Sequence, residues 1–279
     1  MDGFDSRTTL ARDDLAEQAL EGVVAASRYR AVEPMWCTAP IAGLRKQPDP
    51  HAEQLDQLLF GEAFEALDHR GGWTWGRARR DSYVGWVETA ALTRGTPMPT
   101  HRVSALRTYA FPRPDAMAGG PSLLNLNALV TVEARDGRFL RASGAGWIVD
   151  SHLAELTDFE TDPLAVAERH LGAPYQWGGR ESVGLDCSGL VQQALFACGR
   201  ACPRDADLQE QALGTDIARA DLARGDLVFW HGHVAWMLDA ERVLHANGHQ
   251  MRVGIETLAE VIDRFRAAGA GEPTRFKRL

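Results

Sequence analysis

The sequence predicts two small all-β barrels followed by one α+β domain. Between residues 29 and 156, short β-like runs are interrupted by Gly, Pro and Asp, and helical periodicity is weak. From residue 158 onward, helical patterns alternate with short apolar strand patterns. We therefore expect an N-terminal segment at residues 1–28, a first barrel at 29–95, a second barrel at 96–157 and the α+β domain at 158–279.

The composition is that of a globular chain. The 279 residues are 45% hydrophobic and 24% charged, which is enough to bury the cores of two or three domains. The 38 acidic and 30 basic residues are interspersed and give a net charge of −8, so nucleic acid is not expected as a partner. No run approaches the ~20 apolar residues of a membrane-spanning helix, so no membrane partner is expected either.

Location and oligomeric state follow from the same composition. The first 20 residues hold many charged side chains and no apolar run, which is unlike a secretory leader. Four cysteines are too few for a disulfide framework in a chain of this length. We therefore expect a monomeric protein in the cytoplasm.

An internal repeat supports the two barrels. Four positions recur with the same displacement of 61 residues, namely Gly85, Trp86, Val87 and Leu92, which return as Gly146, Trp147, Ile148 and Leu153. Two tandem modules of about 60 residues explain this offset. Each module resembles the bacterial SH3-like domain, and the second copy is the more degenerate. Trp73, Trp75, Trp86 and Trp147 are expected mainly to fill the barrels.

Helices are expected at four places. Leu10, Leu15, Ala19, Leu20 and Val23 lie near helical spacing, so residues 9–27 are predicted to form a short helix that packs on a barrel. Asp162-Pro163 is a typical start for a helix that continues to about residue 170. Further helices are predicted at 188–197 and 257–266. Residues 226–230, 234–239 and 242–246 are predicted to be strands of an antiparallel sheet.

Cys187 stands at the start of the helix predicted at 188–197. The first turn of a helix presents unpaired N–H groups and the positive end of the dipole. We therefore expect a lowered pKa for the Cys187 thiol and N–H groups placed to receive an oxyanion. The alternative is that Cys187 is a small buried hydrophobic residue.

His233 and His245 are the candidate partners of this cysteine. They lie on neighbouring predicted antiparallel strands, where one ring can orient the other. A cysteine, a base and an orienting group form a catalytic triad by role. The alternatives are two core histidines, or a zinc site formed by His231, His233, His245 and His249. Because Cys198 and Cys202 lie beyond a helix and no carboxylate has typical ligand spacing, we expect no metal and no other cofactor.

A series of motifs in the C-terminal part is typical of one family. In chain order the motifs are Tyr175-Gln176-Trp177-Gly178-Gly179, Leu185-Asp186-Cys187-Ser188-Gly189-Leu190, Pro203-Arg204-Asp205-Ala206-Asp207-Leu208-Gln209, Gly225-Asp226-Leu227-Val228-Phe229-Trp230, His233-Val234-Ala235 and Leu244-His245-Ala246. From about residue 162 onward the chain resembles the NlpC/P60 cysteine peptidases, which are papain-like in fold. With two SH3-like modules ahead of it, the chain resembles the γ-D-glutamyl-L-diamino acid endopeptidase branch of that family.

This resemblance implies a substrate and a set of roles. The substrate would be a murein peptide, L-Ala-γ-D-Glu-(diamino acid), cleaved after D-Glu. Cys187 would be the nucleophile, His233 the base and His245 the orienting residue. Tyr175 would stand near the oxyanion, and Trp177, Asp186, Ser188, Arg204 and Asp205 would lie at substrate-contacting positions. Ala206 replaces a serine that is common in the family, so one substrate hydrogen bond is absent or replaced.

The resemblance also implies that the first SH3-like module helps to bind the free amine of L-Ala. Glu53 and Tyr83 are the candidates, and a solvated surface acid and a barrel-packing tyrosine are the alternatives. Two other functions compete with hydrolysis of murein peptides. One is a wall-binding protein with an inactive third domain, against which the intact Cys/His/His set argues. The other is an amidase or acyltransferase that uses the same cysteine.

Overall fold

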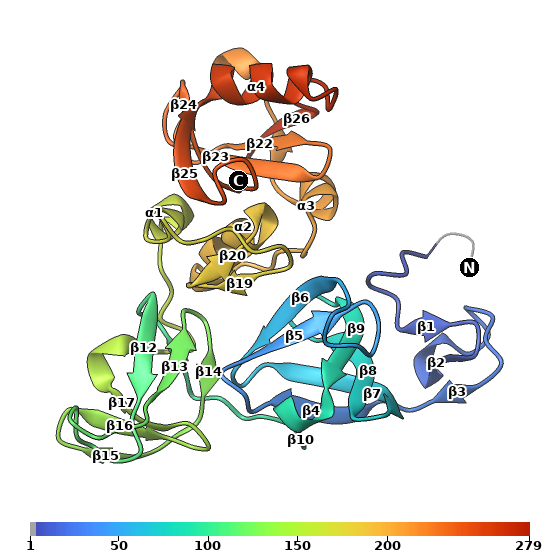
Figure 1. Ribbon diagram of the computed structural model, residues 1–279, viewed down its shortest axis with the longest axis vertical. Coiled ribbons are helices and arrows are strands. Elements are labelled where there is room, and N and C mark those ends of the chain that lie inside the picture. The colour runs from blue at the N-terminus through green and yellow to red at the C-terminus, as the bar shows by residue number, and fades with distance from the viewer. Residues whose placement is uncertain (1–3) are drawn as a thin grey trace. The chain divides into compact units, whose positions relative to one another are not determined.

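The computed structural model describes residues 4–279, and the chain divides into two compact units, residues 1–157 and 158–279 (Figure 1). Among the described residues, the four α-helices all belong to the second unit, whereas the first holds only strands and short 3-10 turns. The prediction of small all-β barrels ahead of an α+β domain is therefore confirmed.

The helix predicted across residues 9–27 is wrong. This segment instead forms strands β1 Ala11–Arg12 and β2 Leu15–Glu17, a 3-10 turn at Gln18–Leu20, and strand β3 Tyr29–Arg30. The apolar residues Leu10 and Leu15 pack on Trp73, Trp75 and Trp86 rather than along one helical stripe. Tertiary contacts thus outweigh a weak helical spacing, and these three tryptophans cover the N-terminal segment.

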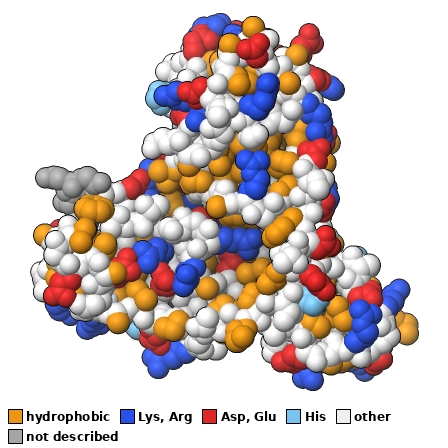
Figure 2. Space-filling model, turned by 180° about the vertical axis from the view of Figure 1, so that it is seen from behind, with side chains coloured by type: hydrophobic (Ala, Val, Ile, Leu, Met, Phe, Trp, Pro, Cys, Tyr) orange, Lys and Arg blue, Asp and Glu red, His pale blue; other side chains and the backbone are white. Residues whose placement is uncertain are grey.

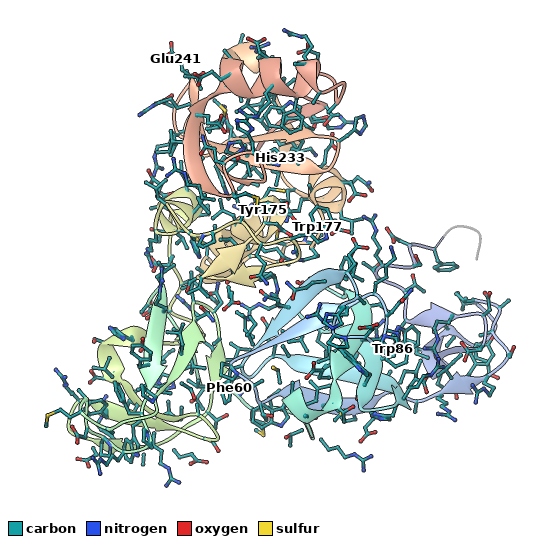
Figure 3. All side chains as sticks on the ribbon, viewed as in Figure 1. Phe60, Trp86, Tyr175, Trp177, His233 and Glu241 are labelled. Atoms are coloured by element: carbon teal, nitrogen blue, oxygen red, sulfur yellow. The ribbon has the colours of Figure 1, made fainter. Side chains whose placement is uncertain are left out.

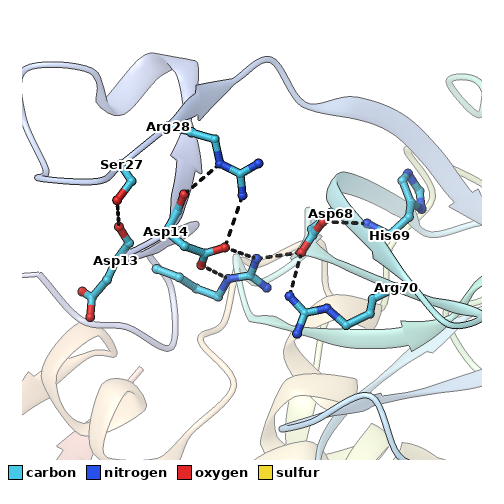
Figure 4. A network of polar contacts seen from close by, with 8 residues as sticks. Asp13, Asp14, Ser27, Arg28, Asp68, His69 and Arg70 are labelled. Carbon is cyan, nitrogen blue, oxygen red and sulfur yellow. Dashed lines mark hydrogen bonds and ion pairs between the residues drawn. The ribbon is translucent and has the colours of Figure 1, made fainter.

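Ion pairs add to the attachment of this segment (Figure 4). The Arg12 guanidinium donates to Asp14 at 3.0 Å and to Asp68 of the first barrel at 2.7 Å. It also lies 4.2 Å from the centroid of the Trp75 ring, and Arg28 reaches Asp14 from the far side of the turn. Side-chain contacts therefore hold the segment on the barrel.

The first barrel is a seven-stranded sheet with strand order β10-β4-β7-β8-β9-β5-β6. Its strands are β4 Glu33–Cys37, β5 Ile41–Arg45, β6 Gln54–Leu59, β7 Ala63–Arg70, β8 Trp73–Ala78, β9 Val84–Glu88 and β10 Leu92–Arg94. Alternate side chains face the interior, where Leu44, Leu58, Phe64 and Val87 are among the buried residues.

The second barrel repeats the order of the first in smaller sheets. Its strands are β11 His101–Val103, β12 Arg107–Ala110, β13 Ser122–Asn125, β14 Leu129–Val130, β15 Val132–Asp136, β16 Phe139–Ala142, β17 Gly146–Val149 and β18 Leu153–Glu155. Its core cluster includes Leu59 and Phe60 from the first barrel, so the two barrels share apolar packing (Phe60 is labelled in Figure 3).

The 61-residue repeat corresponds to one strand–turn–strand unit. In the first barrel β9 leads through a 3-10 turn at Thr89–Ala91 into β10, and in the second β17 leads through Asp150–His152 into β18. The repeated glycine allows close backbone approach, because a Cβ at Gly85 would collide with Leu44 and a Cβ at Gly146 with the Phe111 carbonyl.

The C-terminal unit sets helices against a six-stranded antiparallel sheet of order β21-β26-β22-β23-β24-β25. The strands are β21 Thr215–Asp216, β22 Leu227–Trp230, β23 His233–Met237, β24 Arg242–Asn247, β25 Arg252–Thr257 and β26 Arg275–Arg278. The helices are α1 Pro163–Glu168, α2 Cys187–Ala197, α3 Ala206–Ala212 and α4 Leu258–Ala267, and a ribbon of β19 Arg180–Glu181 and β20 Gly184–Leu185 precedes α2.

The predicted helices and strands of this unit are present with small differences at their ends, whereas β19, β20, β21, β25, β26 and α3 were not predicted. Helix α2 is buried along its whole length and packs against α1, β23 and β24. The central position of α2 brings its first residue close to the start of β23.

The described surface can be followed on one face of the molecule. On the face in Figure 2, acidic and basic side chains are interspersed. No helix within residues 4–279 combines the length and the apolar character needed to cross a membrane.

Candidate active site

Cys187 is the first residue of α2, and its neighbour Asp186 caps the helix. One carboxylate oxygen of Asp186 accepts the Gly189 N–H at 2.8 Å, and the other accepts the Gly178 N–H at 2.9 Å. An aspartate cap satisfies one of the amides that a helix start leaves unpaired. The cap also ties the Gly178 loop to the helix, so the position of Cys187 is fixed from both sides.

Arg204 and Ser188 complete a buried network around this cap. Arg204 donates to both Asp186 oxygens at 2.9 and 2.6 Å and to the Ser188 hydroxyl at 2.8 Å. Only 1% of the Arg204 side chain is exposed. These three residues were predicted to contact substrate, and that role stays a prediction. The geometry gives them a second task, which is to hold the start of α2 in one conformation.

The Cys187 thiol faces the turn between β22 and β23. Its Sγ lies 4.0 Å from the Gly232 carbonyl oxygen, and the residue is 7% exposed. Burial, followed by the negative charge of Asp186, raises the pKa of Cys187 to about 12. The expected lowering of this pKa is therefore wrong, because desolvation of the thiolate and the Asp186 charge outweigh the backbone hydrogen bonds from Val234 and Ser188. The resting nucleophile is a thiol that needs a base.

His233 and His245 are in direct contact on β23 and β24. His233 Nε2 lies 2.8 Å from His245 Nδ1, and both rings are buried. The His233 ring also neighbours the rings of Trp230 and Phe265, with centroids 5.8 and 5.3 Å away. Burial, with the nearby His245 and Arg264, lowers the pKa of His233 to about 3. The ring is thus neutral at neutral pH and able to accept a proton.

Two further residues behind the histidines were not predicted from the sequence. His245 Nε2 lies 2.9 Å from Glu256 Oε2, and Arg264 of α4 donates to both Glu256 oxygens at 2.5 and 2.9 Å. The sequence feature that could have identified Glu256 is its position 11 residues after His245, on the next strand of a hairpin. It was missed because β25 was not predicted.

Tyr175 and Trp177 lie on the loop before β19 (Figure 3). Burial, followed by the charges of Cys187 and Asp186, raises the pKa of Tyr175, so its hydroxyl keeps its proton and can donate a hydrogen bond. Trp177 is 59% exposed. Asp205 occupies the N-cap position of α3, and Ala206 is the first residue of that helix.

Glu53 and Tyr83 belong to the first barrel. Glu53 pairs with Lys46 at 3.1 Å, and Tyr83 packs in the barrel core. Both residues line a cavity of about 540 Å³ whose wall includes Trp75 and Arg12. Tyr83 thus packs in the barrel, as the alternative to substrate binding predicts, and it also lies at the cavity wall.

The histidines of the zinc alternative do not form one cluster. Within residues 4–279, no group of three or more His, Cys, Asp or Glu side chains is arranged to hold a metal ion. His231 and His249 are exposed, whereas His233 and His245 are buried.

Comparisons with known proteins match both units. Residues 44–92 match the bacterial dipeptidyl-peptidase Sh3 domain, and residues 172–268 match the NlpC/P60 family. The gamma-D-glutamyl-L-lysine dipeptidyl-peptidase of Bacillus subtilis is 27% identical over 230 residues, which cover 74% of this chain and 76% of the relative. The peptidoglycan endopeptidase RipB of Mycobacterium tuberculosis is 33% identical over 246 residues, or 82% of this chain and 91% of RipB.

A solved structure supports the fold independently. The crystal structure of an NlpC/P60 family protein from Bacillus cereus matches with a TM-score of 0.75 at 19% identity, covering 88% of this chain and 99% of that one. The fold is thus that of a solved NlpC/P60 family protein. The chain belongs to the NlpC/P60 family and is a cell-wall peptidase with an SH3-like domain ahead of its catalytic domain.

Proposed function

We propose that this peptidase hydrolyses the bond between γ-D-Glu and the diamino acid in murein peptides that have a free N-terminal L-Ala, as part of cytoplasmic wall recycling. The observation behind the proposal is the His233–His245 contact of 2.8 Å beside the helix that begins with Cys187. The B. subtilis relative, a gamma-D-glutamyl-L-lysine dipeptidyl-peptidase, favours this bond.

In the first half of the reaction, Cys187 attacks the γ-carbonyl carbon of D-Glu. The thiol proton passes to Nδ1 of His233, because His245 already occupies Nε2. The new S–C bond places a negative charge on the carbonyl oxygen. His233 then gives its proton to the amine of the diamino acid, the C–N bond breaks, and a thioester remains on Cys187.

The oxyanion needs hydrogen-bond donors that are present before the reaction. The Cys187 N–H lies in the first turn of α2, where N–H groups lack partners within the helix. The protonated Tyr175 hydroxyl is proposed as the second donor. Both act in a largely buried site, where such hydrogen bonds are worth more than in water.

In the second half, water attacks the thioester carbonyl. His233 takes a proton from this water and returns one to the sulfur as the S–C bond breaks. The products are L-Ala-D-Glu and the free diamino acid, and Cys187 is again a thiol. His245 keeps the His233 ring in place throughout, so its loss is expected to be less damaging than loss of the base.

We assign recognition of the free amine to Glu53, Tyr83 and Asp205, with Trp177 as a further contact to the substrate. An ammonium group taken out of water needs an anionic partner. The cavity lined by Glu53 and Tyr83 supports their part in this proposal. Glu53→Gln and Tyr83→Phe should raise KM and weaken discrimination against blocked peptides, and Asp205→Asn should do so more strongly.

The decisive experiment is mass spectrometry of products from matched peptides. L-Ala-γ-D-Glu-meso-diaminopimelate, its L-Lys analogue and the N-acetylated form of each are incubated with the protein. We expect L-Ala-D-Glu from the free-amine peptides only. Equal cleavage of acetylated peptides would remove the free-amine proposal, and transfer of the acyl group to an added amine in place of hydrolysis would favour the acyltransferase alternative.

A further inference from the structure

The ion pair behind the two histidines forms a continuous chain of contacts with them. Starting from α4, Arg264 contacts Glu256, Glu256 contacts His245 Nε2, and His245 Nδ1 contacts His233 Nε2. The Glu256 side chain is almost fully buried, and Asn247 Nδ2 donates to the same Glu256 oxygen at 3.4 Å. The chain ends at His233 Nδ1, the nitrogen that faces the proton transfer from Cys187 in the proposed reaction.

Hydrogen bonding along this chain allows one arrangement of protons. The hydrogen bond from His245, together with Arg264, holds the pKa of Glu256 at about 2, so its carboxylate only accepts hydrogen bonds. His245 Nε2 must therefore carry a proton. A neutral imidazole with its proton on Nε2 has an acceptor at Nδ1, so Nδ1 of the neutral His245 ring accepts a hydrogen bond. His233 Nε2 must then donate, and the lone pair of His233 lies on Nδ1.

We infer that Glu256, held by Arg264, is a positioning residue that fixes the tautomers of both histidines and thereby directs the basic nitrogen of His233 toward Cys187. The inference deepens the proposed function and rests on it for the role of His233 as base. Without the carboxylate, the His245 ring could carry its proton on either of its own nitrogens. In part of the protein molecules, Nδ1 of His245 would then donate its N–H to Nε2 of His233. In that part, His233 Nδ1 would carry a proton and could not accept one from the thiol.

The local fold explains how Glu256 reaches the ring. Strands β24 and β25 are antiparallel, and His245 is paired with Gly254. Because Gly254 has no side chain, the imidazole meets none directly opposite, and Glu256 two residues along the strand lies on the same face.

Helix α4 supports both ends of the chain of contacts. It begins directly after β25 with a capping box formed by Thr257 and Glu260, which fixes its start next to Glu256. Two turns later Arg264 returns to Glu256, and the adjacent Phe265 packs beside the His233 ring. A helix that provides no nucleophile, base or oxyanion donor in the proposed mechanism thus positions the base from two directions.

The test reads the tautomers directly. Side-chain ¹⁵N–¹H correlation spectra of histidine-labelled protein at pH 8 distinguish protonated from unprotonated ring nitrogens. In the native protein we expect His233 and His245 both to be protonated at Nε2 only. In Glu256→Ala we expect mixed tautomers at both rings, with kcat for the free-amine tripeptide reduced about 10- to 100-fold, as when the orienting partners of metal-ligating histidines are removed. KM should stay within about twofold.

Two further variants separate positioning from general stability. Glu256→Gln keeps an oxygen acceptor for His245 and should retain the native tautomers with most of kcat. Asp263→Asn removes an exposed carboxylate of the same helix and should change neither. Native tautomers in Glu256→Ala, or native kcat in that variant, would overturn the inference. Because the spectra need no substrate, an uncleaved peptide with native tautomers would count against the proposed function alone.

Discussion

Two arginine–carboxylate arrangements use the same chemical groups at different degrees of burial. In the catalytic unit, Arg204 pairs with Asp186 at 2.6 Å, and the arginine side chain is 1% exposed. In the N-terminal unit, Arg12 pairs with Asp68 at 2.7 Å, and its side chain is 23% exposed. The distances are nearly equal, so the pair geometry does not distinguish the two.

Burial distinguishes them. An exposed pair is worth about 0–1 kcal/mol, because water already solvates both charges. A buried pair must replace that solvation with hydrogen bonds, and removing one partner costs about 3–5 kcal/mol. The partly exposed N-terminal pair is therefore expected to contribute less and helps to attach a segment, whereas the buried pair beneath Cys187 enforces one conformation of the helix start. The predictions below test this difference, beginning with the largest expected effect.

Cys187→Ala should abolish hydrolysis without unfolding the protein, since the covalent route loses its nucleophile while a buried sulfur typically contributes only ~1–2 kcal/mol. Peptide turnover and the urea midpoint measure the two effects. Cys202→Ala is the matched control, because Cys202 is also buried and has no role in the proposed mechanism. Turnover by Cys187→Ala at the native rate would show that Cys187 is not the nucleophile.

Arg204→Met should lower the free energy of unfolding by about 3–5 kcal/mol, because Asp186 is left as a buried unpaired charge. Urea denaturation at pH 7 measures the loss. The double variant Asp186→Asn/Arg204→Met should recover part of it, since no charge then remains buried. A loss of unfolding free energy below about 1 kcal/mol would show that the Arg204–Asp186 pair contributes no more than a solvent-exposed ion pair.

Acidification should destabilise the native protein through His233. Its pKa is about 3 when folded, against 6.5 for the ordinary group, so below pH 6.5 the unfolded chain binds a proton that the folded chain does not. Stability is then lost as the pH falls from about 6.5 toward 3, with up to ~1.4 kcal/mol per pH unit for one proton. Urea denaturation between pH 7 and 4 gives the free energy of unfolding at each pH, and its dependence on pH should be shallower for His233→Ala than for the native protein. Equal dependence in the two proteins would contradict the lowered pKa of His233.

Arg12→Gln should have the smallest effect, about 1 kcal/mol of unfolding free energy, from the ion pair with Asp68 and the contact with the Trp75 ring. Added salt should reduce the difference between variant and native protein, because this pair is partly exposed. A loss as large as that of Arg204→Met would show that burial does not separate the two arrangements.

Much of the site followed from local sequence. Cys187 at a helix start and two histidines on neighbouring strands were predicted from spacing, and the structure brings the two rings into contact. Glu256 and Arg264 were missed because their relation to His245 depends on how β24 pairs with β25 and on where α4 begins. Register across a hairpin and the return of a helix are long-range properties that short-range spacing does not encode.

The sequence by itself determined the two barrels, helices α1, α2 and α4, strands β22, β23 and β24 and the family motifs, because residue periodicity and turn residues act over a few positions. Only the tertiary structure decided that residues 9–27 form strands on a tryptophan surface rather than a helix. It also decided that the Cys187 thiol has a raised pKa and not a lowered one. Both outcomes depend on burial, which is set by residues distant in the chain, so local patterns could not specify them.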